Sequence, residues 1–510
     1  MIKPKFIFGL IILSFVYLLT RLQNLTSIPV FGDEAIYLRW SQLIKNVETL
    51  RFVPLSDGKQ PLFMWLTVPF FKIISDPLLA GRTLSVVIGL FSLISLCLTF
   101  SLYLNFSSKT KQPHIFILDS INKYPLLSLI PGLVYLFLPL TFFFDRLALP
   151  DGLLSLFGVL TLFFTILLAK YPRLDISMFL GFVLGLAWLT KSPAIYFVVL
   201  SNLGFVLLSS SRKFYYPLFS ALIAFLIFNL LRLGPQFQQI ALRNLDYVWP
   251  LSEILRHPLD PLIPHLKDLL VYYLQYLSLP FLVLSIIAFV IPLVKSKSLT
   301  RPSLFILCFF LLPTLANLCL IKVFTGRYFL FTAPSLIIFL SLSLIKYFRL
   351  SQKIFQSIKL QILIILLCFL PNFYWLFMVS FRPFNVKLPV SESGYLEGWT
   401  AGWGIRSVAD YLISRSINYN VIVGTEGYFG TLPDGLQIYT DSIPRLTVFG
   451  LDTGLTQIPA KLIDAKNFGD DVYLLLNSPK QTLSQSALDR LSLTQSFTKP
   501  DGSQLLLYKL

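Results

Sequence analysis

The amino-acid sequence predicts a polytopic α-helical membrane protein with about 11 transmembrane helices, an amphipathic first outer loop and a C-terminal α/β domain outside the membrane. Apolar runs of roughly 18–25 residues recur along residues 1–381, and a helix needs this length to cross a bilayer. Only 13% of the residues are charged, about half the fraction typical of a soluble protein. After residue 381 the long apolar runs stop, and Gly, Asp, Asn, Thr and Ser become frequent. We therefore expect a transmembrane domain over 1–381 and an extracytoplasmic domain over 382–510.

The first predicted helix follows two basic residues, Lys3 and Lys5, and ends near Arg21. Its pattern resembles a signal peptide, but no small-residue cleavage site follows, so we expect an uncleaved membrane helix. A long polar and amphipathic outer loop, 22–77, comes next. The further spans are expected near residues 79–104, 125–144, 152–169, 177–190, 194–210, 214–231, 269–294, 303–320, 328–346 and 360–380.

The basic residues indicate the orientation of these spans. Lys and Arg gather in short loops between apolar runs, which is typical of membrane proteins and not of nucleic-acid binding, although the net charge is +17. The loops carry Lys109, Lys111 and Lys123; Lys170 and Arg173; Arg212 and Lys213; Lys295, Lys297 and Arg301; and Lys346, Arg349, Lys353 and Lys359. With the predicted spans, all of them fall on one side. We expect a protein of the plasma (inner) membrane with a cytoplasmic N-terminus and an extracytoplasmic C-terminal domain.

The region after residue 381 has the pattern of a small α/β domain. Short β-rich runs occur at 420–425, 446–451, 471–477 and 503–510, and a helical pattern precedes them at 405–416. Several aromatic residues of this region have two interpretations, as platforms for acceptor glycans or as core and interface residues, and we favour the second. They are Tyr395, Trp399, Trp403 and Tyr428.

The first outer loop places two acids side by side, Asp33 and Glu34. Apolar residues at helical spacing follow them to about Leu50, which predicts an amphipathic helix able to lie on the membrane surface. Acids at a helix N-terminus are stabilised by the helix dipole, so the purely structural interpretation is that they cap the helix. The alternative is a catalytic pair, and the stretch alone does not decide between the two.

Several cations lie near the predicted outer ends of spans. Lys59 stands just before Pro61, where it either binds a phosphate at headgroup level or only anchors the helix. Lys191 interrupts a long apolar stretch and needs a polar cavity, a ligand or the interface. Arg327 and Tyr328 stand at the start of another span.

One turn between apolar runs carries Asp145, Arg146 and Asp151. Arg146 has the simpler interpretation of a partner for an acid, and Asp151 that of a helix cap. In the predicted topology, however, several charged residues share the outer membrane face and would converge in one cavity: Asp33, Lys59, Asp145, Asp151, Lys191 and Arg327. Such a cavity suits chemistry on a lipid-linked phosphate, because cations hold the phosphate and a carboxylate handles the incoming nucleophile.

The order of the motifs resembles the C-type glycosyltransferase superfamily. The motifs are GDEAIY (32–37), KQPLFMWL (59–66), GRTL (81–84), RLALPD (146–151), LTKSP (189–193) and RY (327–328). The branch that they resemble contains the dolichyl-phosphate-mannose–protein mannosyltransferases and the aminoarabinose-to-lipid-A transferases. The resemblance covers roughly residues 1–350, and it departs from the family where Gln60 replaces the first of two prolines.

The resemblance implies transfer of a hexose or pentose from a polyprenyl-phosphate donor to a lipid, glycan or protein acceptor in the cell envelope. It implies that Asp33 is the catalytic base or the residue that orients the acceptor, with Glu34 as the second acid of the pair. It further implies that Lys59 contacts the donor phosphate, that Asp151 lies near the same cavity and that Arg327 is a further phosphate ligand. We add Arg146, Lys191 and Tyr328 as substrate-binding candidates, and we expect inversion at the anomeric carbon.

No cofactor is implied with certainty, but some members of the superfamily hold a divalent metal near the first-loop acids. Glu34 and a histidine, His265, are the candidate ligands here, although loop histidines are more often solvated. Two other functions fit a chain of this composition. A lipid or anionic-solute transporter or flippase would show repeats and broken helices at the midplane, and a non-catalytic scaffold would leave the charged set unexplained.

Overall fold

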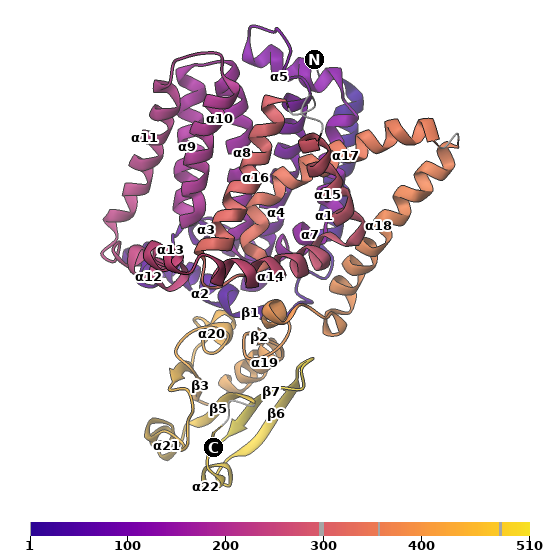
Figure 1. Ribbon diagram of the computed structural model, residues 1–510. Helices are drawn as coiled ribbons and strands as arrows, with labels where there is room; N and C mark the ends of the chain where they lie inside the picture. The colour runs from indigo at the N-terminus through magenta and orange to yellow at the C-terminus, as the bar shows by residue number, and fades with distance from the viewer. Residues whose placement is uncertain (1, 295–299, 355–356, 479–481) are drawn as a thin grey trace. The chain divides into compact units, whose positions relative to one another are not determined.

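The computed structural model describes residues 2–294, 300–354, 357–478 and 482–510 (Figure 1). The chain divides into two compact units, and both are discontinuous in sequence. Unit 1 comprises Met1–Gln23, Arg51–Phe63 and Leu84–Phe377; unit 2 comprises Asn24–Leu50, Met64–Thr83 and Met378–Leu510.

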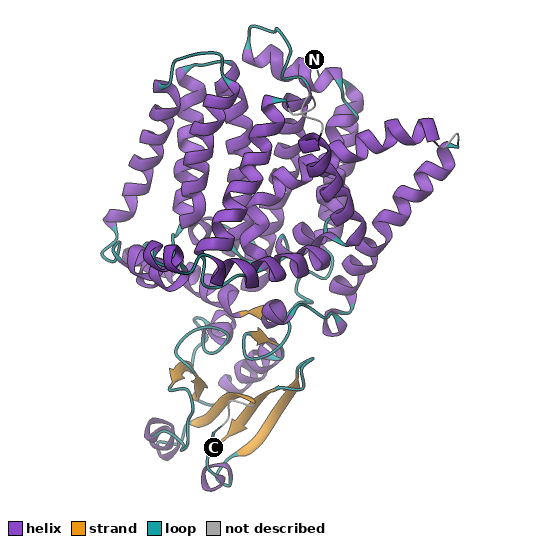
Figure 2. Cartoon of the chain, in the orientation of Figure 1, coloured by secondary structure: helices purple, strands orange, loops and turns teal. Residues whose placement is uncertain are grey.

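Unit 1 is helical (Figure 2). Its helices are α1 (Pro4–Leu22), most of α4 (Pro77–Leu104), α5 (Pro113–Lys123), α6 (Ile130–Phe137), α7 (Pro139–Phe144), α8 (Pro150–Lys170), α9 (Leu174–Thr190), α10 (Ile195–Leu208), α11 (Tyr215–Phe228), α12 (Gln239–Tyr247), α13 (Leu251–Arg256), α14 (Leu259–Leu277), α15 (Leu279–Val294), α16 (Arg301–Leu320), α17 (Ala333–Ile354) and most of α18 (Ile358–Phe381). Helices α9 and α11 pack closely, because Gly181 and Gly185 stand against Ile223 and Ile227. A Cβ atom on either glycine would approach these isoleucines to 2.7 and 2.6 Å.

Each predicted span coincides with helix, but not all of them are straight. Among the described residues, six helices are long and apolar enough to cross a membrane, or seven if a bent pair is one span. Several other apolar helices, α9 and α10 among them, are shorter. The number of membrane crossings therefore stays a prediction.

The prediction of one continuous span over 269–294 is wrong. The chain forms α14 and α15 there, with a bend of 117° between Leu259–Leu277 and Leu279–Ile286. The break lies at Ser278, whose φ of 66° is incompatible with a helix. Pro280 follows in the first turn of α15, and it has no N–H with which to continue the hydrogen bonding of α14 through the break.

The basic loops that the structure describes lie at one end of the unit 1 helices. The connections from α4 to α5, from α8 to α9 and from α10 to α11 all lie at the end where α1 begins (Figure 1). Lys295 and Lys297 fall outside the described residues. The starts of α8 and α10 and the end of α9 lie at the opposite end, which carries several of the candidate site residues.

Unit 2 contains a five-stranded sheet with the order β4-β3-β5-β7-β6. The strands are β3 (Val421–Glu426), β4 (Leu446–Leu451), β5 (Asp471–Ser478), β6 (Ser492–Thr498) and β7 (Gln504–Lys509). Strand β3 pairs in parallel with β4 and β5, and the pairs β5–β7 and β6–β7 are antiparallel. The four predicted strands and the helix α19 (Ile405–Ser416) are confirmed. Edge strand β6 was missed, because its largely polar and exposed side chains give no apolar pattern.

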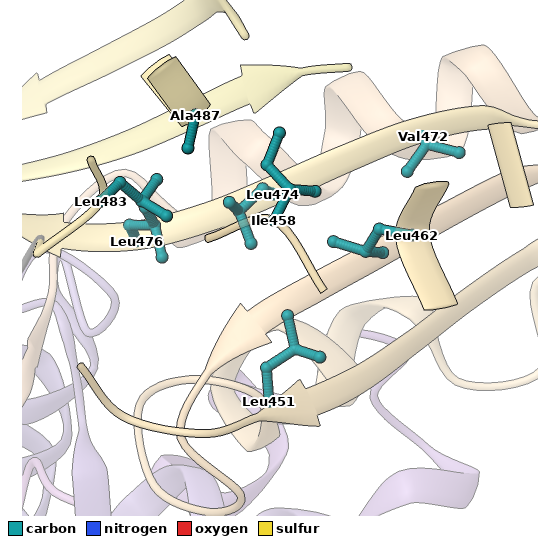
Figure 3. Close-up of a cluster of buried hydrophobic side chains, with 8 residues drawn as sticks. All are labelled: Leu451, Ile458, Leu462, Val472, Leu474, Leu476, Leu483 and Ala487. Carbon is teal, nitrogen blue, oxygen red and sulfur yellow. The ribbon is translucent and has the colours of Figure 1, made fainter. Parts of the chain in front are cut away.

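One face of the sheet holds an aliphatic core with α21 (Ala460–Asn467) and α22 (Gln485–Leu488) (Figure 3). It contains Leu451, Ile458, Leu462, Val472, Leu474, Leu476, Leu483 and Ala487. Strand β5 is central and buried on both faces, which explains its unbroken apolar run.

Part of the first loop folds with the C-terminal region in unit 2. Strand β1 (Val30–Phe31) pairs antiparallel with β2 (Ala401–Gly402), and α2 (Gly32–Asn46) packs on α20 (Asp434–Thr440). The Gln42 side chain donates to the carbonyl of Ile438 at 2.8 Å.

The face of α2 that is buried differs from the apolar stripe expected from the sequence. Ala35 and Leu38 are fully buried, whereas Val47, a member of the stripe, is 40% exposed. The helix ends at Asn46, and a 3₁₀ turn, Glu48–Leu50, completes the predicted segment. The stripe therefore stays available to a surface outside unit 2, as a membrane-surface helix requires.

Candidate functional site

In unit 2, Glu34 is held by a buried arginine. Both side chains are 0% exposed, and Arg82 donates to the two carboxylate oxygens of Glu34 at 2.9 and 2.7 Å. Arg82 also donates to the carbonyls of Leu25, Ile28 and Pro29, and Glu34 accepts from the backbone N–H of Phe31 at 3.0 Å. Glu34 therefore accepts from the N-cap backbone N–H, as the acid of a capping box does, and fixes the chain that leads into α2, although the Phe31 side chain has no acceptor for the reciprocal bond.

Arg82 is the residue whose role the sequence reasoning missed. It lies in the GRTL motif near the start of α4, where the motif alone assigned it nothing. The available signal was a cation at the edge of a long apolar run, which must find a partner when it is buried.

Asp33 precedes Glu34 in the first turn of α2 and is partly buried. The preceding residue, Gly32, donates its N–H to the carbonyl of Thr400 at 3.0 Å, and the Thr431 hydroxyl donates to the same carbonyl at 3.0 Å. A Cβ atom at Gly32 would lie 3.3 Å from the Thr431 hydroxyl oxygen. The start of α2 is thus packed against two loops of the C-terminal region, and the helix dipole favours the ionised form of an acid at this position.

In unit 1, a tight turn presents Lys59. The turn ends at Gly58, whose φ is 65° and where a Cβ atom would lie 2.6 Å from the carbonyl oxygen of Gln239. Only glycine suits this position. The Lys59 ammonium donates to the Tyr247 hydroxyl at 3.1 Å and lies 4.5 Å from the centre of that ring, with 28% of its side chain exposed.

Asp151 and Lys191 form a pair at the end of unit 1 opposite the basic loops. Their side chains are 2.6 Å apart, and the Lys191 ammonium also lies 4.7 Å from the centre of the Tyr328 ring. Asp151 is only 4% exposed, and its second carboxylate oxygen has no hydrogen-bond partner among the residues that the structure describes. The Arg327 guanidinium lies 5.5 Å from the same Tyr328 ring.

A hydrogen bond joins the two lysine motifs. The buried side-chain amide of Gln60, next to Lys59, donates to the hydroxyl of Ser192, next to Lys191, at 2.8 Å. Gln60, which departs from the family pattern, thus connects the two loops. We call the set Lys59, Gln60, Asp151, Lys191, Ser192 and Tyr328 the lysine cluster.

Asp145 and Arg146 have structural partners in unit 1. Asp145 accepts hydrogen bonds from the hydroxyls of Tyr17 and Tyr135 at 2.9 and 3.0 Å. The fully buried Arg146 donates to three carbonyls at the end of α1, the shortest of these bonds being 2.8 Å to Gln23. Arg146 therefore caps α1, and we leave it out of the proposed substrate site.

The candidate metal ligands Glu34 and His265 each have other partners within their own unit. In unit 2, both oxygens of Glu34 accept from the Arg82 cation. In unit 1, the His265 ring stacks on Phe324 with centroids 4.5 Å apart, and its Nδ1 lies 2.9 Å from the carbonyl oxygen of Leu318. Across the described ranges, no group of three or more His, Cys, Asp or Glu side chains is placed to hold a metal ion.

A half-buried carboxyl supports one of the loops that contact Gly32. Asp434, the first residue of α20, accepts from the N–H of Gly430 at 2.6 Å, and burial raises its pKa to about 6.

We expect Asp434→Asn to keep this acceptor, to remove the charge and to raise stability at pH 7.5 by about 1–2 kcal/mol. The folded pKa exceeds the unfolded one, so the gain should shrink as the pH falls below about 6 and be small near pH 4, where the folded carboxyl is neutral and the unfolded one is about half ionised. Thermal unfolding of the full chain measures this, with exposed Asp464→Asn as the control. An equal gain at pH 7.5 and pH 4 would contradict it.

The bundle of apolar helices, the first-loop acids on α2 and the C-terminal α/β region make up a fold that is similar to solved structures, as the resemblance to the C-type glycosyltransferases implies. The chain is similar over 99% of its length to ArnT from Cupriavidus metallidurans, at 12% identity and covering 97% of that chain. The TM-score is 0.56 for the apo structure and 0.58 for the structure bound to undecaprenyl phosphate.

A further similar structure is the Archaeoglobus fulgidus oligosaccharyltransferase tethered to an acceptor peptide. It has a TM-score of 0.52 and 10% identity, and the match covers 99% of this chain and 74% of that one. No protein-family model and no curated protein sequence matches the chain. At these identities the similarity shows the fold, and the fold that the motifs predicted is confirmed.

Proposed function

We propose that this chain is an integral-membrane glycosyltransferase that moves a sugar from a polyprenyl-phosphate donor to an acceptor at the outer face of the plasma membrane. The N-terminus would be cytoplasmic and the C-terminal domain extracytoplasmic. The fold supports this, because it extends over almost the whole length of ArnT, and one ArnT structure holds undecaprenyl phosphate.

The observation that carries the proposal is the hydrogen bond between Gln60 and Ser192, which joins the loops of Lys59 and Lys191. Two ammonium groups presented from joined loops suit a phosphate with two charged oxygens. Lys191 is paired with Asp151 at 2.6 Å, whereas Lys59 lies 4.0 Å from Asp57, an acid that Arg243 binds more closely at 2.6 Å. Lys59 is therefore the less compensated of the two lysines, with Arg327 as a further candidate. Tyr328 would hold Lys191 in place through its ring.

The reaction follows from the bonds that change. The acceptor hydroxyl oxygen attacks the anomeric carbon from the side opposite the phosphate, and the bond from that carbon to the phosphate oxygen breaks. The electron pair of the broken bond leaves with the phosphate, where cations stabilise the growing charge. Asp33 would accept the hydroxyl proton or orient the hydroxyl that carries it, and the anomeric configuration would invert in this single displacement. Glu34 and Arg82 would act by positioning Asp33.

Cells that lack the chain test the proposal. We expect a lipid-linked sugar to accumulate and one class of envelope glycoconjugate to disappear, as measured by mass spectrometry of both fractions. The wild-type chain should restore the product, and the Asp33→Asn chain should not. Translocation of a lipid by the purified chain without any new glycosidic bond would instead establish the transporter alternative.

Lys59→Met should weaken the binding of undecaprenyl phosphate about 10- to 100-fold, because a hydrogen bond to a charged group is lost. Binding to the purified full chain in nanodiscs can be measured by native mass spectrometry. The matched control is Lys123→Met at the basic end of unit 1, since Lys123 also has a ring contact, at 5.3 Å from Tyr124, and a 3.1 Å hydrogen bond. Equal affinities of the two variants would remove Lys59 from the phosphate site.

A further inference from the structure

Three large aromatic side chains of unit 2 are exposed on two adjacent loops. Trp399 is 47% exposed, Tyr428 65% and Phe429 70%. A Cβ atom on Gly430 would lie 3.8 Å from the ring of Trp399, which places the loop 427–431 beside the loop 397–400. We call Trp399, Tyr428 and Phe429 the aromatic surface.

The two other aromatic residues considered from the sequence are not part of this surface. Tyr395 is 4% exposed and lies against Phe31, with ring centroids 4.5 Å apart. The indole N–H of Trp403 donates to the carbonyl of Leu396 at 2.6 Å. Tyr395 is therefore a core residue, as favoured from the sequence, whereas the side chains of the aromatic surface face solvent.

Backbone and side-chain hydrogen bonds hold both loops in place. Gly427 donates to the carbonyl of Leu451 at 2.9 Å, and Gly398 donates to Asp501 at 3.0 Å. The Lys499 ammonium, 2% exposed, donates to the carbonyl of Gly398 at 2.7 Å. Loops fixed in this way lose little conformational freedom when a ligand binds.

The aromatic surface adjoins the proposed catalytic acid within the same unit. Thr400, next to Trp399, accepts the N–H of Gly32, the residue before Asp33. Thr431, two residues after Phe429, donates to the same carbonyl. A ligand on these rings would therefore lie next to the start of α2.

The chemistry of the surface indicates its ligand. Tyr428 donates its hydroxyl to Asp452 at 2.7 Å, and Glu397 and Asp501 border Gly398. The loops 397–400 and 427–431 contain no Lys or Arg. The ammonium of Lys499 beside Gly398 is 2% exposed and donates to Gly398 and Asn477. The aromatic surface is therefore not built to attract an anionic lipid headgroup. A sugar ring offers an apolar C–H face to aromatic rings, and its hydroxyls can donate to carboxylates and threonines.

We propose that the aromatic surface binds the acceptor through a saccharide ring that carries no anionic group, and that it directs an acceptor hydroxyl toward Asp33. The inference rests on the proposed transferase function and adds the chemical class of the acceptor. It also gives the C-terminal part of the chain a direct role in acceptor recognition.

The first experiment measures binding and does not need catalysis. Full-length Asp33→Asn protein in nanodiscs is tested against an array of neutral, amino-sugar and acidic oligosaccharides. We expect a neutral or amino-sugar ligand, and about tenfold weaker binding for Trp399→Ala and for Phe429→Ala. Phe429→Trp should retain affinity. The matched control is Phe468→Ala, since Phe468 is 87% exposed in the same unit. Binding of acidic glycans only, or affinities that the substitutions leave unchanged, would overturn the inference.

The second experiment separates this inference from the proposed function. In transfer assays with the identified acceptor, the aromatic variants should raise KM for the acceptor about tenfold and leave KM for the polyprenyl donor unchanged. If the wild-type chain transfers sugar and the aromatic variants have the same KM for the acceptor, the aromatic surface is not the acceptor site. The proposed transferase function would remain. Saccharide binding without transfer under any donor would overturn the transferase instead. Thermal unfolding of each variant confirms that it is folded.

Discussion

Asp33→Asn should lower the rate of sugar transfer about 10²- to 10⁴-fold, because asparagine has the shape of aspartate but cannot accept the proton of the acceptor hydroxyl. The helix should remain in place, since the bond to the N-cap N–H and the Arg82 contacts at the start of α2 belong to Glu34. Donor binding should also be unchanged, because no residue of the lysine cluster is altered. Single-turnover transfer in nanodiscs measures the loss.

A second acid tests the simpler interpretation that Asp33 only caps its helix. Asp175 lies in the first turn of α9 and accepts the N–H of Ile176 at 2.9 Å. Asp175→Asn should leave the transfer rate within about twofold, since removing such a surface charge costs only about 0.3–1 kcal/mol of stability. Similar losses for Asp33→Asn and Asp175→Asn would assign Asp33 to capping alone.

Arg82→Met should destabilise unit 2 by about 3–5 kcal/mol, because it leaves the carboxylate of Glu34 buried without a cation. Three backbone carbonyls lose their donor in the same step. We also expect transfer activity to fall, since the chain that leads to Asp33 is no longer fixed. Thermal unfolding and transfer assays on the full chain check the two effects.

Two comparisons sharpen this prediction. The Glu34→Gln/Arg82→Met chain should regain part of the stability, because no unpaired charge remains. Arg173→Met breaks a pair of the same 2.7 Å length, but Arg173 and Asp175 are 54% and 51% exposed, so the cost should stay below about 1 kcal/mol. If Arg82→Met cost no more than Arg173→Met, Glu34 would have another compensating partner.

The sequence predicted the helices and strands that depend mainly on residues close to one another in the chain. The helices and four strands of the C-terminal sheet follow from length, apolar runs and short β-rich segments, which need no knowledge of distant partners. The bend at Ser278 was not predicted, because apolar residues continue through it without a compositional change. Strand β6 was not predicted either, because its pairing with β7, and not its composition, makes it a strand.

The candidate site shows the same division. Motif order pointed to Lys59 and Lys191, and the structure joins their loops through Gln60, a residue that looked like a mere departure. Arg146 was also a substrate-binding candidate from its motif, but the structure shows that it caps α1. Whether a cation in such a motif binds substrate or backbone depends on which carbonyls lie within reach, and only the folded chain determines this.

The pairing of β1 with β2 has a consequence for how the protein is made. Residues 30–31 are translated early, but their partners at 401–402 and the helix α20 beneath α2 are translated near the end. The segment that carries Asp33 therefore cannot reach its final conformation while the ribosome is still producing the membrane helices. A nascent chain, or one that stops short of residue 401, would lack both β2 and α20 as partners for this segment. We therefore expect the proposed transfer activity to begin only after the C-terminal region has been synthesised.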